Sequence, residues 1–220
     1  MFRINKTDLL RHHVPDTGSD RIAYNLAIFV SWTVGNSFFQ RRYGERAIIL
    51  ETVTAVPPMV VATLLHLKCL RGMLDDKGWV RTFMDEAENQ RAHLMAFVEL
   101  TRPNSWERFL IALAQGVFYN AYFLLYLISA RTAHRLAAYF AEQAVQGYSQ
   151  YLAQIVSDAR GAEAAPSMAI AYWGLEPDAE VRDMILAMLE DEAIHRDLHH
   201  AFADALAQGQ TFPDRSGGVA

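Results

Sequence analysis

The chain has 220 residues, a formal net charge of -5 and an apolar content of 52%. This length predicts one domain with a buried core, and the apolar content excludes an intrinsically disordered chain. The acidic balance, with a pI of about 5.9, argues against electrostatic binding of nucleic acid, so no nucleic-acid partner is expected. The single cysteine, Cys69, cannot form an internal disulfide and lacks zinc-finger spacing, which favours a reducing compartment.

The order of segments along the chain predicts an all-α fold. Residues 1–16 lack the apolar segment of a secretory signal, so residues 1–19 are interpreted as an N-terminal arm of the mature protein. Helix-forming residues dominate the chain after this arm, and no Asn-Gly or Asp-Gly hairpin turn interrupts them. The helices are expected at 20–38, 43–73, 78–101, 105–130, 131–159, 164–173 and 178–208. They form one helical domain over 20–208, and the Gly, Pro and Ser residues of 209–220 predict a flexible tail.

Two of these segments carry no charged side chain, from Ile22 to Gln40 and from Phe109 to Ala130. Each is about long enough to span a bilayer, which takes roughly 20 residues. Three interpretations are open: core helices of a soluble bundle, helices lying in one membrane face, and a transmembrane pair. The second is favoured because arginines that can meet phosphate headgroups flank the stretches. These arginines are Arg41, Arg42, Arg108 and Arg131.

The last long helix contains a Glu-x-x-His motif, formed by Glu192 and His195. Residues three apart share a helix face, so both side chains can converge on one metal ion. His199 extends this face by one turn. A single motif of this kind also arises by chance, and alone it indicates a metal site only weakly.

Two earlier segments add polar groups in apolar surroundings. Glu86, Gln90 and His93 share one face of an amphipathic helix. Glutamine stands where a second Glu-x-x-His motif would need glutamate. Glu51 directly follows the apolar run AIIL. A carboxylate in that position needs a partner or an ion.

Several long segments resemble the alternative oxidase family of membrane-bound quinol oxidases, over about residues 20–205. They read RRYGERAIILETVTAVPPMVVATLLHLKCLR, GWVRTFMDEAENQRAHLMAFVEL, AQGVFYNAYFLLYLISARTAHRLAAYF and PDAEVRDMILAMLEDEAIHRDLHH. The resemblance implies a ferritin-like four-helix bundle made by the helices at 43–73, 78–101, 131–159 and 178–208, with the helices at 20–38 and 105–130 against one membrane leaflet. It also implies a homodimer that uses two irons to pass electrons from quinol to oxygen.

The family's iron ligands are four glutamates, one per bundle helix, with a histidine three residues after two of them. Carried over by resemblance, the ligand positions that this chain retains are Glu51, His93, Glu192 and His195. Gln90 and Ala141 stand where the family has its other two glutamates. Glu142 is the next residue, but one helical step turns it about 100° away. Drift at neighbouring positions favours natural divergence over deliberate substitution at the two changed positions.

Two carboxylates leave too much positive charge on a pair of ferric ions, so we expect one iron rather than two. Two histidines and one carboxylate form the facial arrangement of mononuclear non-haem iron sites. Additional ligands or supporting residues are expected among Gln90, Glu86, His199, Asp191 and Arg91. For Glu86 and Glu88, an ordinary ion pair is favoured over a ligand role.

The resemblance assigns catalytic roles to Tyr148 and His134, although packing and one hydrogen bond commonly explain such buried residues. Positions at or beside the family's quinol headgroup site are Arg46, Leu50, Phe140, Gln143, Ala144, Gly147, Tyr172 and Trp173. The pair Pro57-Pro58 predicts a helix kink close to Glu51.

The leading hypothesis is a monotopic oxidoreductase with an altered iron site, acting on a quinol-like or hydrophobic phenolic substrate. It would lie on the cytoplasmic face of a membrane, or in the cytoplasm if membrane association has been lost. One alternative is an ordinary ubiquinol oxidase that reduces oxygen to water. Others are a non-redox enzyme and a catalytically silent quinone-binding protein on the same fold.

Overall fold

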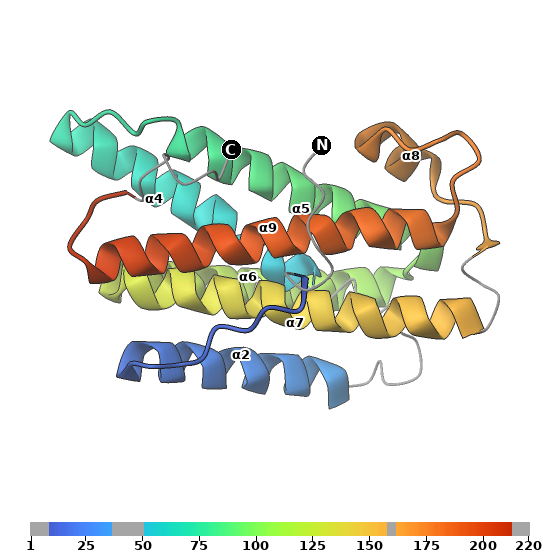
Figure 1. The fold of residues 1–220 in the computed structure, drawn as a ribbon, viewed down its shortest axis with the longest axis horizontal. Helices are drawn as coiled ribbons and strands as arrows, with labels where there is room; N and C mark the ends of the chain where they lie inside the picture. The colour runs from blue at the N-terminus through green and yellow to red at the C-terminus, as the bar shows by residue number, and fades with distance from the viewer. Residues whose placement is uncertain (1–8, 37–50, 158–161, 213–220) are drawn as a thin grey trace.

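A computed structural model describes residues 9–36, 51–157 and 162–212. Within these ranges the chain is helical, with an isolated antiparallel bridge between Ala164 and Glu180 (Figure 1). The all-α prediction is confirmed within the described residues. The expected bounds at 38, 43 and 159 lie outside the described residues; the other helix ends lie within a few residues of those expected. The helices are α2 (Gly18–Asn36), α4 (Val56–Gly72), α5 (Trp79–Thr101), α6 (Ser105–Ile128), α7 (Ala130–Ser157), α8 (Ser167–Trp173) and α9 (Val181–Ala207).

The helix that contains Glu51 is interrupted just before α4. Residues 51–54 are helical, Ala55 forms a turn, and α4 starts at Val56. Pro57 and Pro58 have no N–H to donate, so the hydrogen-bond ladder cannot run through them. This interruption lies at the position where the proline pair predicts a kink. The Ala55 N–H still donates to the Glu51 carbonyl at 2.9 Å, which keeps Glu51 attached to the start of α4.

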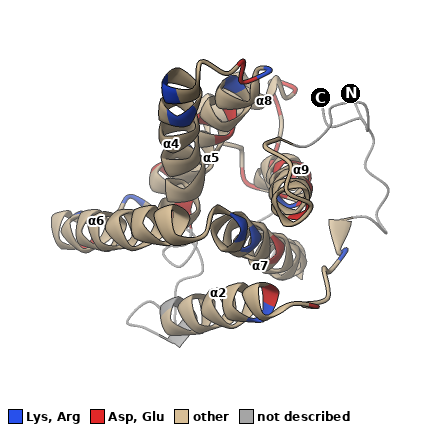
Figure 2. Ribbon diagram, turned by 90° about the vertical axis from the view of Figure 1, so that its left-hand side faces the viewer, with Lys and Arg blue, Asp and Glu red and all other residues tan. Residues whose placement is uncertain are grey.

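Four long helices form the bundle. α4 packs against α5 and α7 against α9, while contacts of α5 with α9 and of α4 with α7 close the ring. Two further helices lie outside it: α2 packs on α7, and α6 packs on α4 and α7 (Figures 1 and 2). The bundle helices are those that the resemblance implies.

The outer helix α6 differs from α4 in where its apolar side chains lie. By length and composition, two described helices could cross a membrane, 51–72 and 105–128, and their most apolar windows are 56% and 6% buried, respectively. The first is thus a core helix of the bundle. Along α6, Tyr122 is the buried residue, and charged side chains are nearly lacking (Figure 2). Its large exposed residues include Phe109, Leu113, Val117 and Leu124.

Local sequence explains where the helices start and stop. Asn104 caps α6 by accepting from the backbone N–H groups of Trp106 and Glu107, and the Glu107 side chain accepts in return from the Asn104 N–H. This reciprocal pair is a capping box. Between α4 and α5, Gly78 has a φ of 80°. Glycine adopts that left-handed conformation at little cost.

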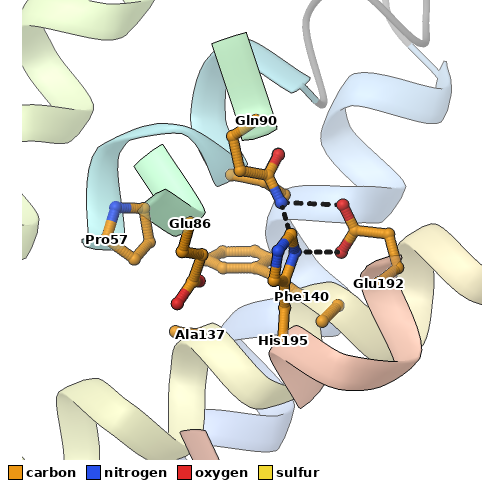
Figure 3. Close-up of a pocket in the computed structure, with 9 residues that line it drawn as sticks. Pro57, Glu86, Gln90, Ala137, Phe140, Glu192 and His195 are labelled. Atoms are coloured by element: carbon orange, nitrogen blue, oxygen red, sulfur yellow. Dashed lines mark hydrogen bonds and ion pairs between the residues drawn. The ribbon is translucent and has the colours of Figure 1, made fainter. Parts of the chain in front are cut away.

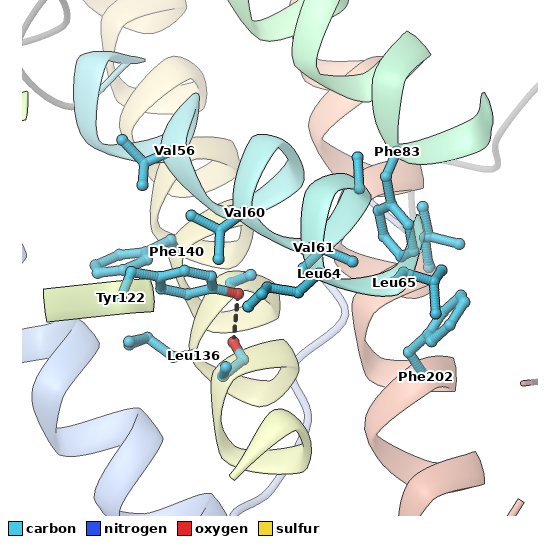
Figure 4. Close-up of a cluster of buried hydrophobic side chains, with 14 of the residues drawn as sticks. Val56, Val60, Val61, Leu64, Leu65, Phe83, Tyr122, Leu136, Phe140 and Phe202 are labelled. Atoms are coloured by element: carbon cyan, nitrogen blue, oxygen red, sulfur yellow. Dashed lines mark hydrogen bonds between the residues drawn. The ribbon is translucent and has the colours of Figure 1, made fainter. Parts of the chain in front are cut away.

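Two apolar clusters fill the bundle, and a polar layer lies between them. One cluster includes Val60 of α4, Phe83 of α5 and Phe202 of α9 (Figure 4). The other includes Phe97 of α5 and Leu189 of α9. On α5 the polar positions fall between Phe83 and Phe97, so they are enclosed by apolar side chains on both sides. Burying polar groups there is costly unless each finds a partner.

Candidate metal centre

Three side chains from three helical segments converge in the polar layer: Glu51, His93 and Glu192. Each offers one ligand atom, and these atoms lie within 4.8 Å of one another. His93 Nδ1 is 3.4 Å from Glu51 Oε2 and 3.4 Å from Glu192 Oε1. All three residues are at most 1% exposed. The structure therefore brings together three of the four predicted ligand residues.

Several atoms of this cluster are buried without a hydrogen-bond partner. They are Glu51 Oε2, His93 Nδ1 and Glu192 Oε2. An unsatisfied buried acceptor costs about 1–3 kcal/mol, and more for a charged group. A single cation between Glu51 Oε2, His93 Nδ1 and Glu192 Oε2 would accept an electron pair from each of these atoms. The donor set of one imidazole nitrogen and carboxylate oxygens suits iron or zinc.

The electrostatics of the cluster favour positive charge between its carboxylates. Burial raises the pKa of Glu51. Burial opposes protonation of His93, but the nearby carboxylates of Asp191, Glu192 and Glu51 outweigh it and raise the pKa of His93 well above its usual range. Burial also opposes ionisation of Glu192, yet the nearby rings of His195 and His93 outweigh it and lower the pKa of Glu192 to about 2. The cluster thus favours negative charge on Glu192 and positive charge beside it.

Asp191 binds the ring nitrogen of His93 that points away from the cluster. His93 Nε2 lies 3.2 Å from Asp191 Oδ2. The same carboxylate oxygen accepts from Asn89 Nδ2 at 2.7 Å and from Trp173 Nε1 at 2.8 Å. A carboxylate on the far side of a histidine sets the ring orientation and strengthens it as a ligand. His93 therefore presents Nδ1 to the cluster.

Tyr148 holds the other side of the cluster. Its hydroxyl donates to Glu51 Oε1, and its ring stacks on Phe97 with a centroid distance of 5.8 Å. Tyr148 is buried. One oxygen of Glu51 is thus fixed by Tyr148, and the other is left facing His93.

Gln90 joins the cluster to His195. Its Nε2 donates to Glu192 Oε1 at 2.7 Å and contacts His195 Nδ1 at 3.0 Å (Figure 3). Its Oε1 accepts from the Thr54 hydroxyl at 2.8 Å. His195 Nδ1 is 3.7 Å from Glu192 Oε2, so His195 lies beside the three-residue cluster. Because an amide nitrogen can only donate, His195 Nδ1 accepts from Gln90. Burial opposes protonation of His195, but Glu86 and Glu192 raise its pKa overall.

A small cavity lies next to Gln90, on the side of α7. Its volume is about 10 Å³, close to the minimum that holds one water molecule. Ala141 offers no donor atom to this space. Glu86 does border it, and Glu86 Oε2 is buried without a hydrogen-bond partner. The lining residues are Thr54, Pro57, Glu86, Gln90, Ala137, Phe140, Ala141, Glu192 and His195 (Figure 3).

Glu142 faces away from the cluster, towards the N-terminal arm. Its carboxylate lies 2.6 Å from His12 Nδ1 and 3.0 Å from His200 Nε2, and accepts from the His13 backbone N–H at 3.0 Å. Burial opposes ionisation, but these hydrogen bonds lower the pKa of Glu142. The side chain anchors the arm to α7 and α9. Sequence spacing indicated that Glu142 points elsewhere, but not what it binds.

The remaining predicted residues on α5, α7 and α9 lie at increasing distance from the cluster. His199 links Glu86 to His134, with distances of 2.9 Å from Nε2 to Glu86 Oε1 and 2.9 Å between the two Nδ1 atoms. Burial, reinforced by His199, lowers the pKa of His134 well below its usual range. Arg91 lies on the exposed side of α5, where it pairs with Glu88 at 2.6 Å.

The predicted substrate residues are spread over several environments. Arg46 and Leu50 lie outside the described residues. Phe140 and Ala144 are buried, and Gln143, Gly147 and Trp173 are partly buried. Tyr172 is 40% exposed.

Sequence reasoning missed two side chains that set the geometry of the cluster. Thr54 orients Gln90, and Asn89 binds Asp191. Thr54 lies three residues after Glu51, on the same helical face, and Asn89 directly precedes Gln90. Their closeness to ligand positions was the only signal, and it does not identify their partners.

Comparison with known proteins gives a consistent result. The sequence matches the alternative oxidase family over residues 4–204. A mitochondrial ubiquinol oxidase of Mangifera indica is 46% identical over 207 residues, which cover 94% of this chain and 65% of that protein. Mitochondrial ubiquinol oxidase 1a of Arabidopsis thaliana is 47% identical over 203 residues, covering 92% and 57% of the two chains. For mitochondrial ubiquinol oxidase 2 of Nicotiana tabacum the identity is 45% over 213 residues, covering 94% and 69%. The chain thus spans 57–69% of the length of these relatives.

Proposed function

Because the chain belongs to the alternative oxidase family, we propose that it is a membrane-associated oxidoreductase that oxidises a quinol with oxygen at a single iron ion. The relatives named as ubiquinol oxidases support the substrate class, a quinol-like or hydrophobic phenolic molecule. The observation that carries the proposal is the convergence of unpartnered Glu51, His93 and Glu192 atoms in a buried layer.

One ion fits these residues. Glu51, His93 and Glu192 supply three donors. His195, the fourth ligand expected from the resemblance, lies beside them with its Nδ1 on the Gln90 amide. A second ion does not fit. The family has glutamates at positions 90 and 141, but here Gln90 is neutral and Ala141 has no donor atom. The position of a second ion therefore has two negative charges fewer than in the family's site. Iron, when bound, would supply the one-electron chemistry that oxygen reduction requires.

The protein's own residues prepare the site for that ion. Asp191 sets the orientation of His93, so that Nδ1 faces inward. Tyr148 donates to Oε1 of Glu51 and leaves Oε2 directed at His93. The apolar clusters on both sides keep bulk water away from the layer, which strengthens electrostatic interactions within it.

Substrate binding is proposed near the end of the polar layer that faces α8. Trp173 connects α8 to the site through its hydrogen bond with Asp191. Tyr172 is exposed beside Trp173 on α8, and Gln143 and Gly147 are partly buried on α7. The small cavity beside Ala141 is too narrow for a quinol ring, so we assign it no substrate.

We propose that α2 and α6 attach the protein to one face of a membrane as a monotopic, cytoplasmic-side protein. Support comes from exposed apolar residues on both helices, which bury their other sides on α7. Ile22, Phe29 and Trp32 of α2 are each more than 60% exposed. Apolar patches of this kind on two adjacent elements favour a lipid or protein interface. The homodimer remains a prediction.

The test measures oxygen uptake by the iron-loaded protein in liposomes with a short-chain ubiquinol. Each quinol gives up two electrons and two protons, so complete reduction follows 2 QH2 + O2 → 2 Q + 2 H2O. We expect uptake that requires both quinol and iron and disappears in Glu192→Gln. Quinol-dependent uptake that persists after complete iron removal would contradict the proposal.

A catalytically silent quinone-binding protein is the second candidate, favoured by the replacement of two carboxylate positions by Gln90 and Ala141. It predicts saturable binding of ubiquinol, measured by fluorescence quenching, without oxygen uptake by the iron-loaded protein. Product formed from quinol without oxygen or metal would instead support a non-redox enzyme.

A further inference from the structure

The amide of Gln90 is held in one orientation. Glu192 Oε1 can only accept, and it lies 2.7 Å from the amide nitrogen, which fixes that nitrogen on the side of Glu192 and His195. Gln90 Oε1 faces the opposite way, 2.8 Å from the Thr54 hydroxyl oxygen, which also lies 3.1 Å from the Glu51 carbonyl oxygen. The reverse orientation would bring two acceptor oxygens, one of Gln90 and one of Glu192, into contact. Gln90 is only 2% exposed, so water does not compete for these bonds.

The amide nitrogen lies where two neighbouring groups present electron pairs. It is 2.7 Å from Glu192 Oε1 and 3.0 Å from His195 Nδ1 (Figure 3). An amide nitrogen carries two hydrogens, one for each acceptor. A metal ion at this point would need the same electron pairs. The amide and a second ion therefore compete for the same place.

The surrounding residues do not supply an alternative set of ligands. Ala141 lines the cavity next to Gln90 and has no donor atom, and this cavity has a volume of about 10 Å³. Glu86 borders this cavity, but one of its oxygens is bound by His199 at 2.9 Å. Beyond Glu192 and His195, which the amide already binds, the second position thus has one free carboxylate oxygen, from Glu86, where a cation would need more negative charge.

We propose that the Gln90 amide replaces the second metal ion of the family's site, and thereby makes this chain selective for one ion. Its two N–H groups hold Glu192 and His195 in position, as a cation would. Gln90 is therefore a positioning residue. The inference rests on the proposed one-metal centre and adds the physical reason for the metal count.

The experiment compares two variants that each add one carboxylate, Gln90→Glu and Ala141→Glu. Only Gln90→Glu also removes the amide hydrogens. Protein is titrated anaerobically with Fe(II), and in parallel with redox-inert Zn(II), and ions per chain are counted by native mass spectrometry. We expect Gln90→Glu to rise from one ion to two, while Ala141→Glu stays at one, like the unmodified protein. Two ions in Ala141→Glu, or one in Gln90→Glu, would overturn the role of the amide.

An added buried carboxylate can also prevent folding, so two further measurements keep the test decisive. The thermal midpoint of Gln90→Glu should fall below that of the unmodified protein without metal and recover with saturating Zn(II). A crystal of the unmodified Zn(II)-loaded protein should show one anomalous peak beside Glu51, His93 and Glu192, with Gln90 still bonded to His195. A second peak at the amide position would contradict the proposal.

These readouts use neither quinol nor oxygen, so they separate this inference from the proposed activity. No metal in the unmodified protein would contradict the one-metal centre itself. One metal in all three proteins would contradict only the role of Gln90. Loss of quinol oxidation with the expected metal counts would contradict only the activity.

Discussion

Glu142 and His200 form a buried contact, with 3.0 Å between the carboxylate Oε1 and the imidazole Nε2. Arg135 NH1 lies 2.7 Å from the other ring nitrogen of His200. Since Arg135 can only donate, His200 accepts at Nδ1 and donates from Nε2 to Glu142. Although Glu142 directly follows Ala141, this contact commits its carboxylate to the junction of α7, α9 and the arm.

Glu142→Ala should therefore destabilise the protein without changing its metal content. It leaves the donors of His12, His13 and His200 without their acceptor, and removing one partner of a buried pair costs about 3–5 kcal/mol. For a chain of this size we expect the thermal midpoint to fall by roughly 6–20 °C in calorimetry. Exposed Glu190→Ala is the matched control, with a change of about 0.5 kcal/mol or less. Loss of bound iron in a folded Glu142→Ala protein would show that Glu142 is a ligand.

The lowered pKa of His134 predicts acid sensitivity of the metal-free protein. Below about pH 6.5 the unfolded chain binds a proton at this residue that the folded protein excludes. This group therefore lowers stability as pH falls, by up to about 1.4 kcal/mol per pH unit. In urea unfolding between pH 7 and pH 5, His134→Gln should lose stability less steeply than the unmodified protein. The exposed His66→Gln serves as control, and an equal slope for all three proteins would contradict burial of a neutral His134.

Much of the fold can be predicted from sequence because helix signals are local. The Pro57-Pro58 pair predicts the break before α4, and the apolar period places the helix ends within a few residues. Glu51, His93 and Glu192 were also accessible, through spacing and family resemblance. The contact between Glu142 and His12 was not, because these residues are 130 positions apart and meet only when the arm folds back. The same holds for Thr54 and Gln90, whose orientation depends on the packing of two helices.

Glu192→Gln should abolish tight metal binding. It replaces a buried anionic ligand by a neutral amide, and the effect should exceed the roughly 10–100-fold loss caused by removing only a partner of a ligand. Asp191→Asn, which weakens the support of His93, should fall within that 10–100-fold range. Zn(II) affinities from competition with a chromogenic chelator provide the measurement. Glu190→Gln, on the exposed side of the same helix, should bind Zn(II) with the affinity of the unmodified protein. Equal affinities for Glu192→Gln and Glu190→Gln would show that Glu192 is not a ligand.

Aspartates on the outer face of α6 should release the protein from membranes. Phe109 and Leu113 are each 55% exposed on this helix, so Phe109→Asp with Leu113→Asp should leave the fold intact while opposing burial in lipid. We expect the fraction that sediments with anionic liposomes to fall several-fold. The control places aspartates at Met84 and Ile194, which are similarly exposed, at 47% and 48%, on bundle helices. Equal loss of binding in both double variants would contradict a membrane face on α6.

The iron content of the unmodified chain tests the central proposal most directly. Protein loaded anaerobically with excess Fe(II), freed of loosely bound metal and analysed by inductively coupled plasma mass spectrometry should contain about one iron per chain. That value is expected from a cluster with room and charge for a single ion among Glu51, His93 and Glu192. Two tightly held irons per chain, or none, would contradict it.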